Sequence, residues 1–312
     1  MKLLHKLKIF LRANLKVRLR STNSLTFAFT LLGIFLFIIM IMYVGYNLYR
    51  EGSELLPYFA ALNFWWVLGS FLMYSCALAL ALVIWLAMMM RLTGNKDIKR
   101  HIQVYCYTNL ARRIPGPLLH VVGRAYLYRK DKIGIVPVST ASGLEFVLLV
   151  VSGLIAYSML DLWNGLTYRS FILLLCIFFG LLLVHPHNLR WILQKLGQPV
   201  FGDILTYRDI LLWLGLYVLI WFAGGLSLCC TVNALLPINF SQVVGIMAAW
   251  SLSGVLATIV VFLPSGLGLR EITLSALLLP FMPSTFAVTI ALLIRFLLTF
   301  YEMMWAFFVI WL

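Results

Sequence analysis

The sequence predicts an all-α, polytopic membrane protein of about seven spans with two broken or re-entrant elements. Apolar runs of about 20 residues recur along the chain, and each is long enough for a helix to cross a hydrocarbon core of about 30 Å. Charged residues make up only 11% of the chain, against roughly one quarter in soluble domains, and the mean hydropathy is +1.00. These values exclude a soluble globular enzyme. The runs do not alternate between apolar and polar positions, which excludes a membrane β-barrel.

The elements follow one another without a large soluble domain between them. A basic arm, residues 1–23, precedes a single transmembrane domain, residues 24–312. The arm has no small-residue cleavage site, so we expect it to be retained and cytosolic. The expected spans are Ser24–Leu48, Phe64–Met90, Ile133–Leu160, Tyr168–Val184, Asp209–Thr231, Ser241–Leu263 and Thr285–Leu312.

The distribution of Lys and Arg predicts the orientation, because these residues are biased toward cytoplasmic loops. They precede the first span, separate the second from the third, and follow the fourth, which places 20 of the 24 on one side. The N-terminus is therefore predicted to be cytoplasmic, in an inner or plasma membrane. A net charge of +14 beside membrane spans favours the phosphates of anionic lipids as partners, and we expect no nucleic acid.

Two stretches, near residues 109–128 and 264–282, fit neither a loop nor a regular span. Proline and glycine interrupt helices in both, and free backbone groups at membrane depth are tolerated only inside protein or beside a water-filled cavity. In each stretch Pro and Gly precede an arginine and then an apolar helix, which suggests a two-fold internal repeat. The residues that interrupt the two stretches are Pro115, Gly116, Pro117, Pro264, Gly266 and Gly268, and Gly123 with Arg124 follows the first interruption.

Ionisable side chains inside apolar spans are the candidates for function. Each costs at least about 2.5 kcal/mol at the centre of a membrane helix, so each calls for a partner or a purpose. One interpretation is that the glutamates only form buried ion pairs with arginines that hold the bundle together. The other is that the arginines and the ends of broken helices capture a phosphate, while the glutamates position the arginines or carry protons. The candidates inside spans are Glu145, Arg270, Glu271, Arg295 and Glu302.

Polar residues also recur at helical spacing on two of the expected spans. Ser139, Ser142, Glu145 and Ser152 share roughly one face of the third span, and Arg295, Thr299 and Glu302 share a face of the last. We expect these two stripes to face one polar interior. The five cysteines lie in or beside apolar runs without metal-ligand spacing, so no metal or cofactor is expected.

The two broken stretches resemble the lysylphosphatidylglycerol synthase transmembrane family, also called flippase-like membrane proteins. The resemblance rests on Asn109, Arg113 and Arg124 in the first half, and on the segment 264–271 with Arg295 in the second. It implies a helical domain that moves lipids between leaflets, fused in some members to a soluble aminoacyl-transferase domain. We expect no such domain here, because the chain ends within its last span, and hence no lysyl transfer and no enzyme.

The leading hypothesis is a flippase or transporter for an anionic lipid or a polyprenyl-linked phosphate. Its headgroup site would form where the two stretches meet, with Glu271, Glu145 and Glu302 as charge partners or proton carriers. An alternative is a membrane glycosyl- or phospho-transferase acting on a lipid-linked substrate. A second is a non-catalytic scaffold that forms a homo-oligomer or holds a partner membrane enzyme, favoured only by a stripe of small residues between Gly245 and Ala257. The predicted substrate-binding residues are Arg270, Arg295, Arg124, Arg113, Gly266 and Gly268.

Overall fold

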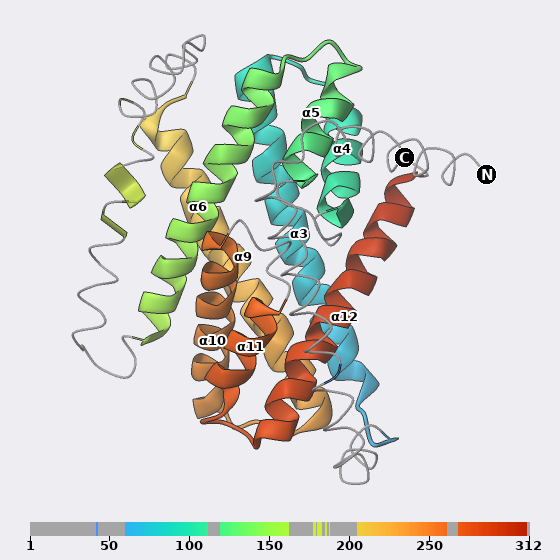
Figure 1. The fold of residues 1–312 in the computed structure, drawn as a ribbon, viewed down its shortest axis with the longest axis vertical. Helices are drawn as coiled ribbons and strands as arrows, with labels where there is room; N and C mark the ends of the chain where they lie inside the picture. The colour runs from blue at the N-terminus through green and yellow to red at the C-terminus, as the bar shows by residue number, and fades with distance from the viewer. Residues whose placement is uncertain are drawn as a thin grey trace.

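The chain folds into a bundle of long helices, seen from the side in Figure 1. The computed structural model describes residues 42, 60–111, 119–161, 177–178, 180–182, 185, 187, 205–260 and 268–310. Within these ranges the regular elements are all helical. The helices are α3 (Phe64–Thr93), α4 (Ile98–Ala111), α5 (Leu119–Arg129), α6 (Ile135–Asp161), α9 (Tyr207–Leu235), α10 (Phe240–Ile259), α11 (Leu269–Leu278) and α12 (Ser284–Ile310).

Five of these helices are long and apolar enough to cross a membrane, namely α3, α6, α9, α10 and α12. They lie within a few residues of five of the predicted spans. The basic arm and most of the two other predicted spans, 24–48 and 168–184, lie outside the described residues. The multi-pass helical architecture predicted from the sequence is therefore confirmed, whereas the total of seven spans stays a prediction.

Local sequence signals explain where several of the long helices begin and end. The side chain of Asn63 caps α3 by accepting a hydrogen bond from the Trp65 amide, 3.0 Å away. The same helix ends at Gly94, whose φ of 68° is a left-handed conformation that favours glycine. At the start of α9, Thr206 and Asp209 form a reciprocal capping box.

Helices α3 and α9 run antiparallel along most of their length, which contacts near both ends establish. Arg91 near the end of α3 pairs with Asp209 at the start of α9, 3.3 Å apart. At the other end, the amide of Asn63 donates to the carbonyl oxygen of Ala234, 3.1 Å away. Between these contacts the hydroxyl of Ser70 lies 2.9 Å from those of Ser227 and Thr231, a buried polar cluster that joins the two helices.

The two stretches that the sequence singled out are helical hairpins at opposite ends of the bundle. Helices α4 and α5 pack together near the end where α3 finishes, and α10 and α11 pack together near the other end (Figure 1). Helix α4 also packs against α12, and α10 against α6. The breaks themselves, residues 112–118 and 261–267, lie outside the described residues.

The order of elements occurs twice along the chain. A long helix, a helical hairpin and a second long helix follow one another as α3, α4–α5 and α6, and again as α9, α10–α11 and α12. Because α3 and α9 are antiparallel, the two sets are inverted relative to each other. This arrangement agrees with the predicted internal repeat and has the inverted form common in transporters.

Small residues allow the helices of the second set to approach closely. A Cβ added to Gly245 of α10 would lie 2.2 Å from Cζ of Phe281, which precedes α12. Ala249 and Ser253 on the same stripe are buried. The stripe of small residues therefore serves helix packing here, as is usual between membrane helices.

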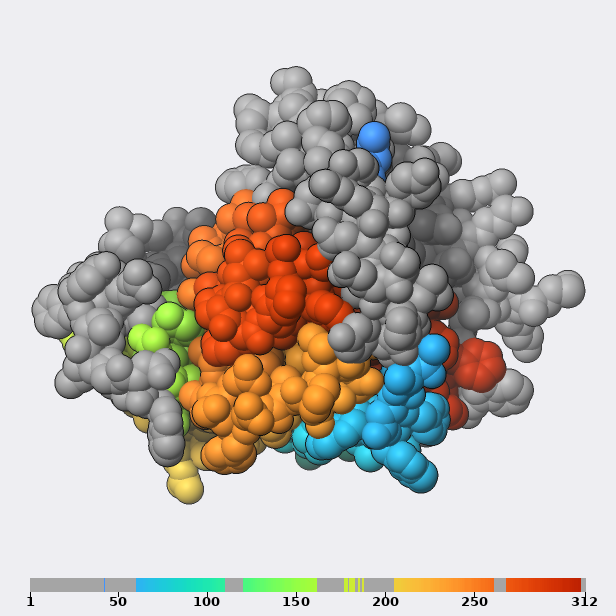
Figure 2. Space-filling view, turned by 90° about the horizontal axis from the view of Figure 1, so that it is seen from below, coloured from blue at the N-terminus to red at the C-terminus, as the bar shows by residue number. Residues whose placement is uncertain are grey.

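Charge is distributed unequally between the two ends of the bundle. In the described connections, basic side chains lie where α3 and α5 end and where α4, α6 and α9 begin. At the opposite end the described connections carry Asp161 as their one charged side chain. Figure 2, seen from this second end, shows the end of α9 beside the start of α3. The cytoplasmic assignment of the basic end remains a prediction.

Candidate functional site

A central cavity of about 500 Å³ lies inside the bundle. Residues from each of the helices α3, α4, α5, α6, α9, α10, α11 and α12 line it, and residues beside both helix breaks are among them: Asn109, His120, Thr258, Val260 and Arg270. Its volume falls within the range of about 300–1,000 Å³ typical of ligand pockets. The two hairpins thus approach one shared interior space, as the hypothesis of a site between the broken stretches requires.

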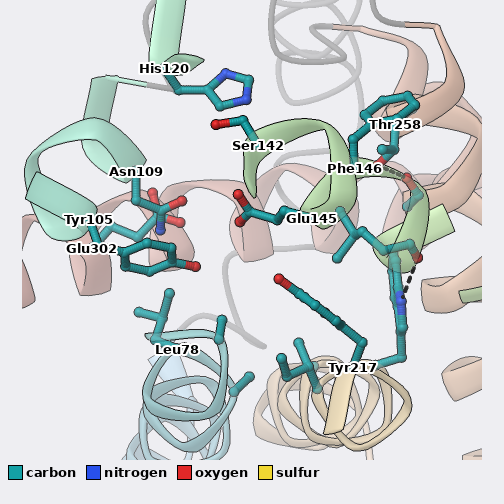
Figure 3. A pocket seen from close by; sticks show the side chains of 18 of the residues that line it. Leu78, Tyr105, Asn109, His120, Ser142, Glu145, Phe146, Tyr217, Thr258 and Glu302 are labelled. Atoms are coloured by element: carbon teal, nitrogen blue, oxygen red, sulfur yellow. Dashed lines mark hydrogen bonds between the residues drawn. The ribbon is translucent and has the colours of Figure 1, made fainter. Parts of the chain in front are cut away.

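Aromatic and polar side chains converge on the cavity (Figure 3). Glu145 of α6 and Tyr217 of α9 point into the space, and Glu302, Tyr105 and Asn109 lie together at one side of it. The wall therefore combines apolar rings with a few polar groups. This composition is typical of pockets that bind a small organic group in one orientation.

Arg270 lies in the first turn of α11 and lines the cavity. Among the described lining residues it is the one Lys or Arg side chain. Its guanidinium carbon lies 4.1 Å from the centre of the Trp250 ring, a cation–π geometry that positions the group at the wall. The side chain is half-buried. A guanidinium in this position can donate several hydrogen bonds to the oxygens of a phosphate.

The residue after Arg270, Glu271, has a structural role. Glu271 is buried, with 4% of its surface exposed, and forms an ion pair with Arg295 of α12. Its other carboxylate oxygen accepts a hydrogen bond of 2.9 Å from the amide of Gly268, which caps the start of α11. Gly268 has a φ of 83°, so a side chain there would be strained. Glu271 therefore fixes the start of α11, and with it the position of Arg270.

A second cavity of about 30 Å³ lies behind Arg270. Its lining includes Trp250, Arg270, Glu271 and Arg295. The space is large enough for one water molecule, and its charged and polar lining would supply that water with hydrogen-bond partners. Arg270 therefore lies between the central cavity and a small polar chamber.

Arg124 of α5 is buried behind Glu145, with 2% of its surface exposed. Its guanidinium forms an ion pair with Glu145, lies 3.9 Å from the centre of the Trp85 ring, and donates to the hydroxyl of Thr108 over 3.3 Å. Arg124 is not among the residues that line the central cavity, whereas Glu145 is. The arginine therefore balances the charge that Glu145 brings to the wall.

The two ion pairs occupy corresponding places in the two halves, with their signs reversed. In the first half the short helix α5 supplies the arginine and the long helix α6 the glutamate. In the second half the short helix α11 supplies the glutamate and the long helix α12 the arginine. Each pair ties the helix that follows a break to the next long helix.

Glu302 of α12 is a further buried carboxylate on the cavity wall, with 6% of its surface exposed. The hydroxyl of Tyr74 on α3 donates to its Oε1 over 2.5 Å. A short hydrogen bond to a carboxylate is stronger than one between neutral groups. It fixes the Glu302 side chain at the junction of α3, α4 and α12.

A comparison of the sequence with models of protein families gives a match that covers most of the chain. The model of the lysylphosphatidylglycerol synthase TM region matches residues 27–304. The chain belongs to this family. Comparisons with curated proteins and with solved structures gave no match.

Membership of the lysylphosphatidylglycerol synthase TM family confirms the resemblance inferred from the sequence, and the predicted site residues can now be placed. Arg270 and Glu145 line the central cavity, as does Glu302. Arg124 forms an ion pair with Glu145, and Arg295 forms one with Glu271; in each pair one partner is buried and the other part-buried. Arg113 and Gly266 lie outside the described residues.

The two polar stripes predicted from helical spacing in the sequence only partly share one interior. Ser139, Ser142 and Glu145 line the cavity. Ser152 instead accepts a hydrogen bond of 3.1 Å from the indole of Trp221. Of the last span's stripe, Glu302 lines the central cavity.

Sequence reasoning missed the aromatic residues of the site. Tyr105, Tyr217, Trp221 and Trp250 all line the cavity. A signal was present in the position of the two tryptophans, since each lies inside a long helix and away from the membrane-interface positions where this residue is enriched. Interior tryptophans of membrane helices therefore merit the attention given to interior charges.

Proposed function

We propose that the protein binds the phosphate-bearing headgroup of an anionic phospholipid or polyprenyl-linked lipid in the central cavity and moves it between leaflets. The observation that carries the proposal is the position of Arg270, on the wall of a cavity of about 500 Å³ beside a broken membrane helix. Family membership supports a role with membrane lipids in general. Beyond this general role, we propose that the cavity binds the headgroup and that the protein transports the lipid.

The charges around the cavity support an anionic ligand. Glu145 brings a negative charge to the wall, but Arg124 directly behind it supplies the compensating positive charge. Glu271 and Arg295 balance each other next to Arg270. The guanidinium of Arg270 brings a positive charge to the cavity wall, which also carries the carboxylate of Glu302 on the side of α12. A phosphate would complement this guanidinium, because bidentate contacts between Arg and phosphate are among the strongest hydrogen-bonded pairs.

The inverted arrangement of the two halves supports transport rather than group transfer. Hairpins α4–α5 and α10–α11 lie near opposite ends of the bundle and both contribute to one cavity. In transporters with inverted repeats the substrate site lies between the repeats, and rocking of one half exposes it to either side. A transferase would need a carboxylate ready to act as a base, whereas Glu145 is engaged by Arg124 and Glu302 by Tyr74. We therefore propose a non-enzymatic role.

Transport in proteoliposomes tests the proposal. The purified protein is reconstituted with trace fluorescent phosphatidylglycerol, or in parallel with a fluorescent polyprenyl phosphate, and the labelled fraction in each leaflet is followed by chemical quenching. Arg270→Ala should lower the apparent affinity for the probe about 10-fold to 150-fold, because a charge-assisted hydrogen bond contributes about 1.5–3 kcal/mol. Arg270→Lys should retain part of the activity, since it keeps the charge.

The matched control is Arg91→Ala. Arg91 lies at the end of α3, where it pairs with Asp209, and more than half of its side chain is exposed. Its removal should leave transport unchanged. Equal transport by the wild-type and Arg270→Ala proteins, with both folded, would contradict the proposal.

A further inference from the structure

A lateral cavity of about 60 Å³ adjoins the central one between α3, α4 and α12. The two cavities share four lining residues, Leu78, Tyr105, Asn109 and Glu302. Figure 3 shows these four residues together at one side of the central cavity. The lateral cavity therefore adjoins, across these four side chains, the space that contains the proposed headgroup site.

The lateral cavity changes from polar to apolar along its length. Its inner residues include the buried side chains of Tyr105 and Glu302. Asn109 is half-buried, and the residues that line this cavity but not the central one are apolar and half-buried or exposed. These outer residues are Ala79, Leu82, Cys106 and Trp305.

Two hydrogen bonds between α3 and α12 fix side chains that surround the lateral cavity. The indole of Trp305 donates to the hydroxyl of Ser75 over 3.0 Å, which fixes the ring between α12 and α3. Tyr74, one residue earlier on α3, donates to Glu302, one turn earlier on α12. The polar inner rim and the apolar outer rim are thus built by neighbouring residues of the same two helices.

A membrane lipid has the same division between a polar head and an apolar chain. We infer that the lateral cavity between α3, α4 and α12 admits the part of a lipid's hydrocarbon chain that lies next to a headgroup in the central cavity, and we call it the passage. Glu302, Asn109 and Tyr105 then form the collar between headgroup and chain. The chain leaves past Leu82, Cys106 and Trp305 into the bilayer, so the lipid enters sideways without withdrawing its chains from the hydrocarbon. This inference rests on the proposed function.

Photocrosslinking tests the path of the chain. The full-length protein is reconstituted with phosphatidylglycerol that carries a diazirine on one acyl chain, irradiated, and digested, and the modified residues are mapped by mass spectrometry. We expect adducts concentrated on Leu82, Cys106 and Trp305, with loss of these adducts when excess unlabelled phosphatidylglycerol is present. Leu72 and Val83 on the exposed face of α3 serve as reference positions, because they line neither cavity.

A variant that fills the passage sharpens the test. Leu82→Trp should remove the adducts at Cys106 and Trp305, and Val83→Trp, one position along the same helix, should leave them. If Leu82→Trp fails to fold, Ala79→Leu narrows the same opening with a smaller side chain. Adducts spread equally over Leu72, Val83 and the passage residues would overturn the inference.

Transport measured on the same proteoliposomes separates this inference from the proposed function. Transport with adducts only at the reference positions would refute the chain path and leave the function standing. Competable adducts in the passage without transport would support the chain path and refute the transport step.

Discussion

The guanidinium of Arg270 lies over the indole of Trp250, 4.1 Å from the ring centre, and both side chains line the central cavity. Trp250 belongs to α10 and Arg270 to α11, so the contact joins the two arms of one hairpin across its break. The ring fixes the cation where a headgroup would meet it. The packing of Trp250 is therefore as important to the proposed site as Arg270 itself.

Replacement of that ring should weaken headgroup binding. For Trp250→Leu we expect a loss of about 0.5–2 kcal/mol, or about twofold to thirtyfold in Kd, because the cation–π contact disappears. Calorimetric titration with short-chain phosphatidylglycerol in detergent measures the change. Trp66→Leu on the exposed face of α3 is the control and should bind like the wild type. Unaltered affinity in Trp250→Leu would show that the ring does not position the cation.

A methyl group added to α9 at Gly224 should displace the ring of Trp250. A Cβ added to Gly224 would lie 2.5 Å from Nε1 of Trp250, whereas one added to Gly215 of the same helix meets nothing within 4 Å. Gly224→Ala should therefore lower the stability by about 1–3 kcal/mol through overpacking. Gly215→Ala should be neutral or stabilising, since alanine favours helix. Denaturation in mixed micelles compares the two, and equal stabilities would contradict the packing described for Trp250.

The buried pair of Arg124 and Glu145 should behave as a unit. Arg124→Met should cost about 3–5 kcal/mol of unfolding free energy, because it leaves the Glu145 carboxylate without its cation. The double variant Arg124→Met with Glu145→Met should recover much of that loss, since no lone charge remains. A double-mutant cycle measures the coupling. Arg91→Met, which breaks an exposed pair, is expected to cost only about 0–1 kcal/mol.

The hydroxyl cluster between α3 and α9 should make a modest contribution to the free energy of unfolding. Ser227→Ala removes its contact with Ser70 and its hydrogen bond of 3.0 Å to the Ser70 carbonyl oxygen. We expect a loss of about 0.6 kcal/mol, with about 1.7 kcal/mol as the upper range for such bonds in membrane proteins. The same denaturation experiment measures it. A stability equal to that of the wild type would mean that the apolar contacts between α3 and α9 hold these helices together without the Ser227 hydroxyl.

The orientation of the basic end can be measured directly. In a background without native cysteines, Lys96→Cys should react with a membrane-impermeant thiol reagent only after the cell membrane is opened, because positively charged loops remain in the cytoplasm. Asp161→Cys at the opposite end should react in intact cells. The reverse pattern would overturn the predicted orientation.

The positions of the helix breaks could be predicted from the sequence because proline and glycine act locally. Pro115 and Pro117 lie in the interval between α4 and α5, and α11 begins directly after Gly268. The described spans were likewise evident from length and hydropathy. Such features depend on residues adjacent in the chain, so one sequence is enough to find them.

The partners of the buried charges could not be predicted in this way. Glu145 and Glu271 each had several arginines as candidates, and only the packing of α5 on α6 and of α11 on α12 selects among them. The hydrogen bond between Tyr74 and Glu302 joins residues 228 positions apart. Such pairs arise from tertiary packing, on which helical periodicity carries no information.

Native mass spectrometry of the protein extracted with its retained lipids tests the central claim most directly. Spectra of the wild-type and Arg270→Ala proteins are recorded under identical conditions, and the bound species are identified by fragmentation. The account predicts a phosphate-bearing lipid bound to the wild type and strongly depleted in Arg270→Ala. Equal retention of that lipid by both proteins, or retention of only neutral lipids by the wild type, would contradict it.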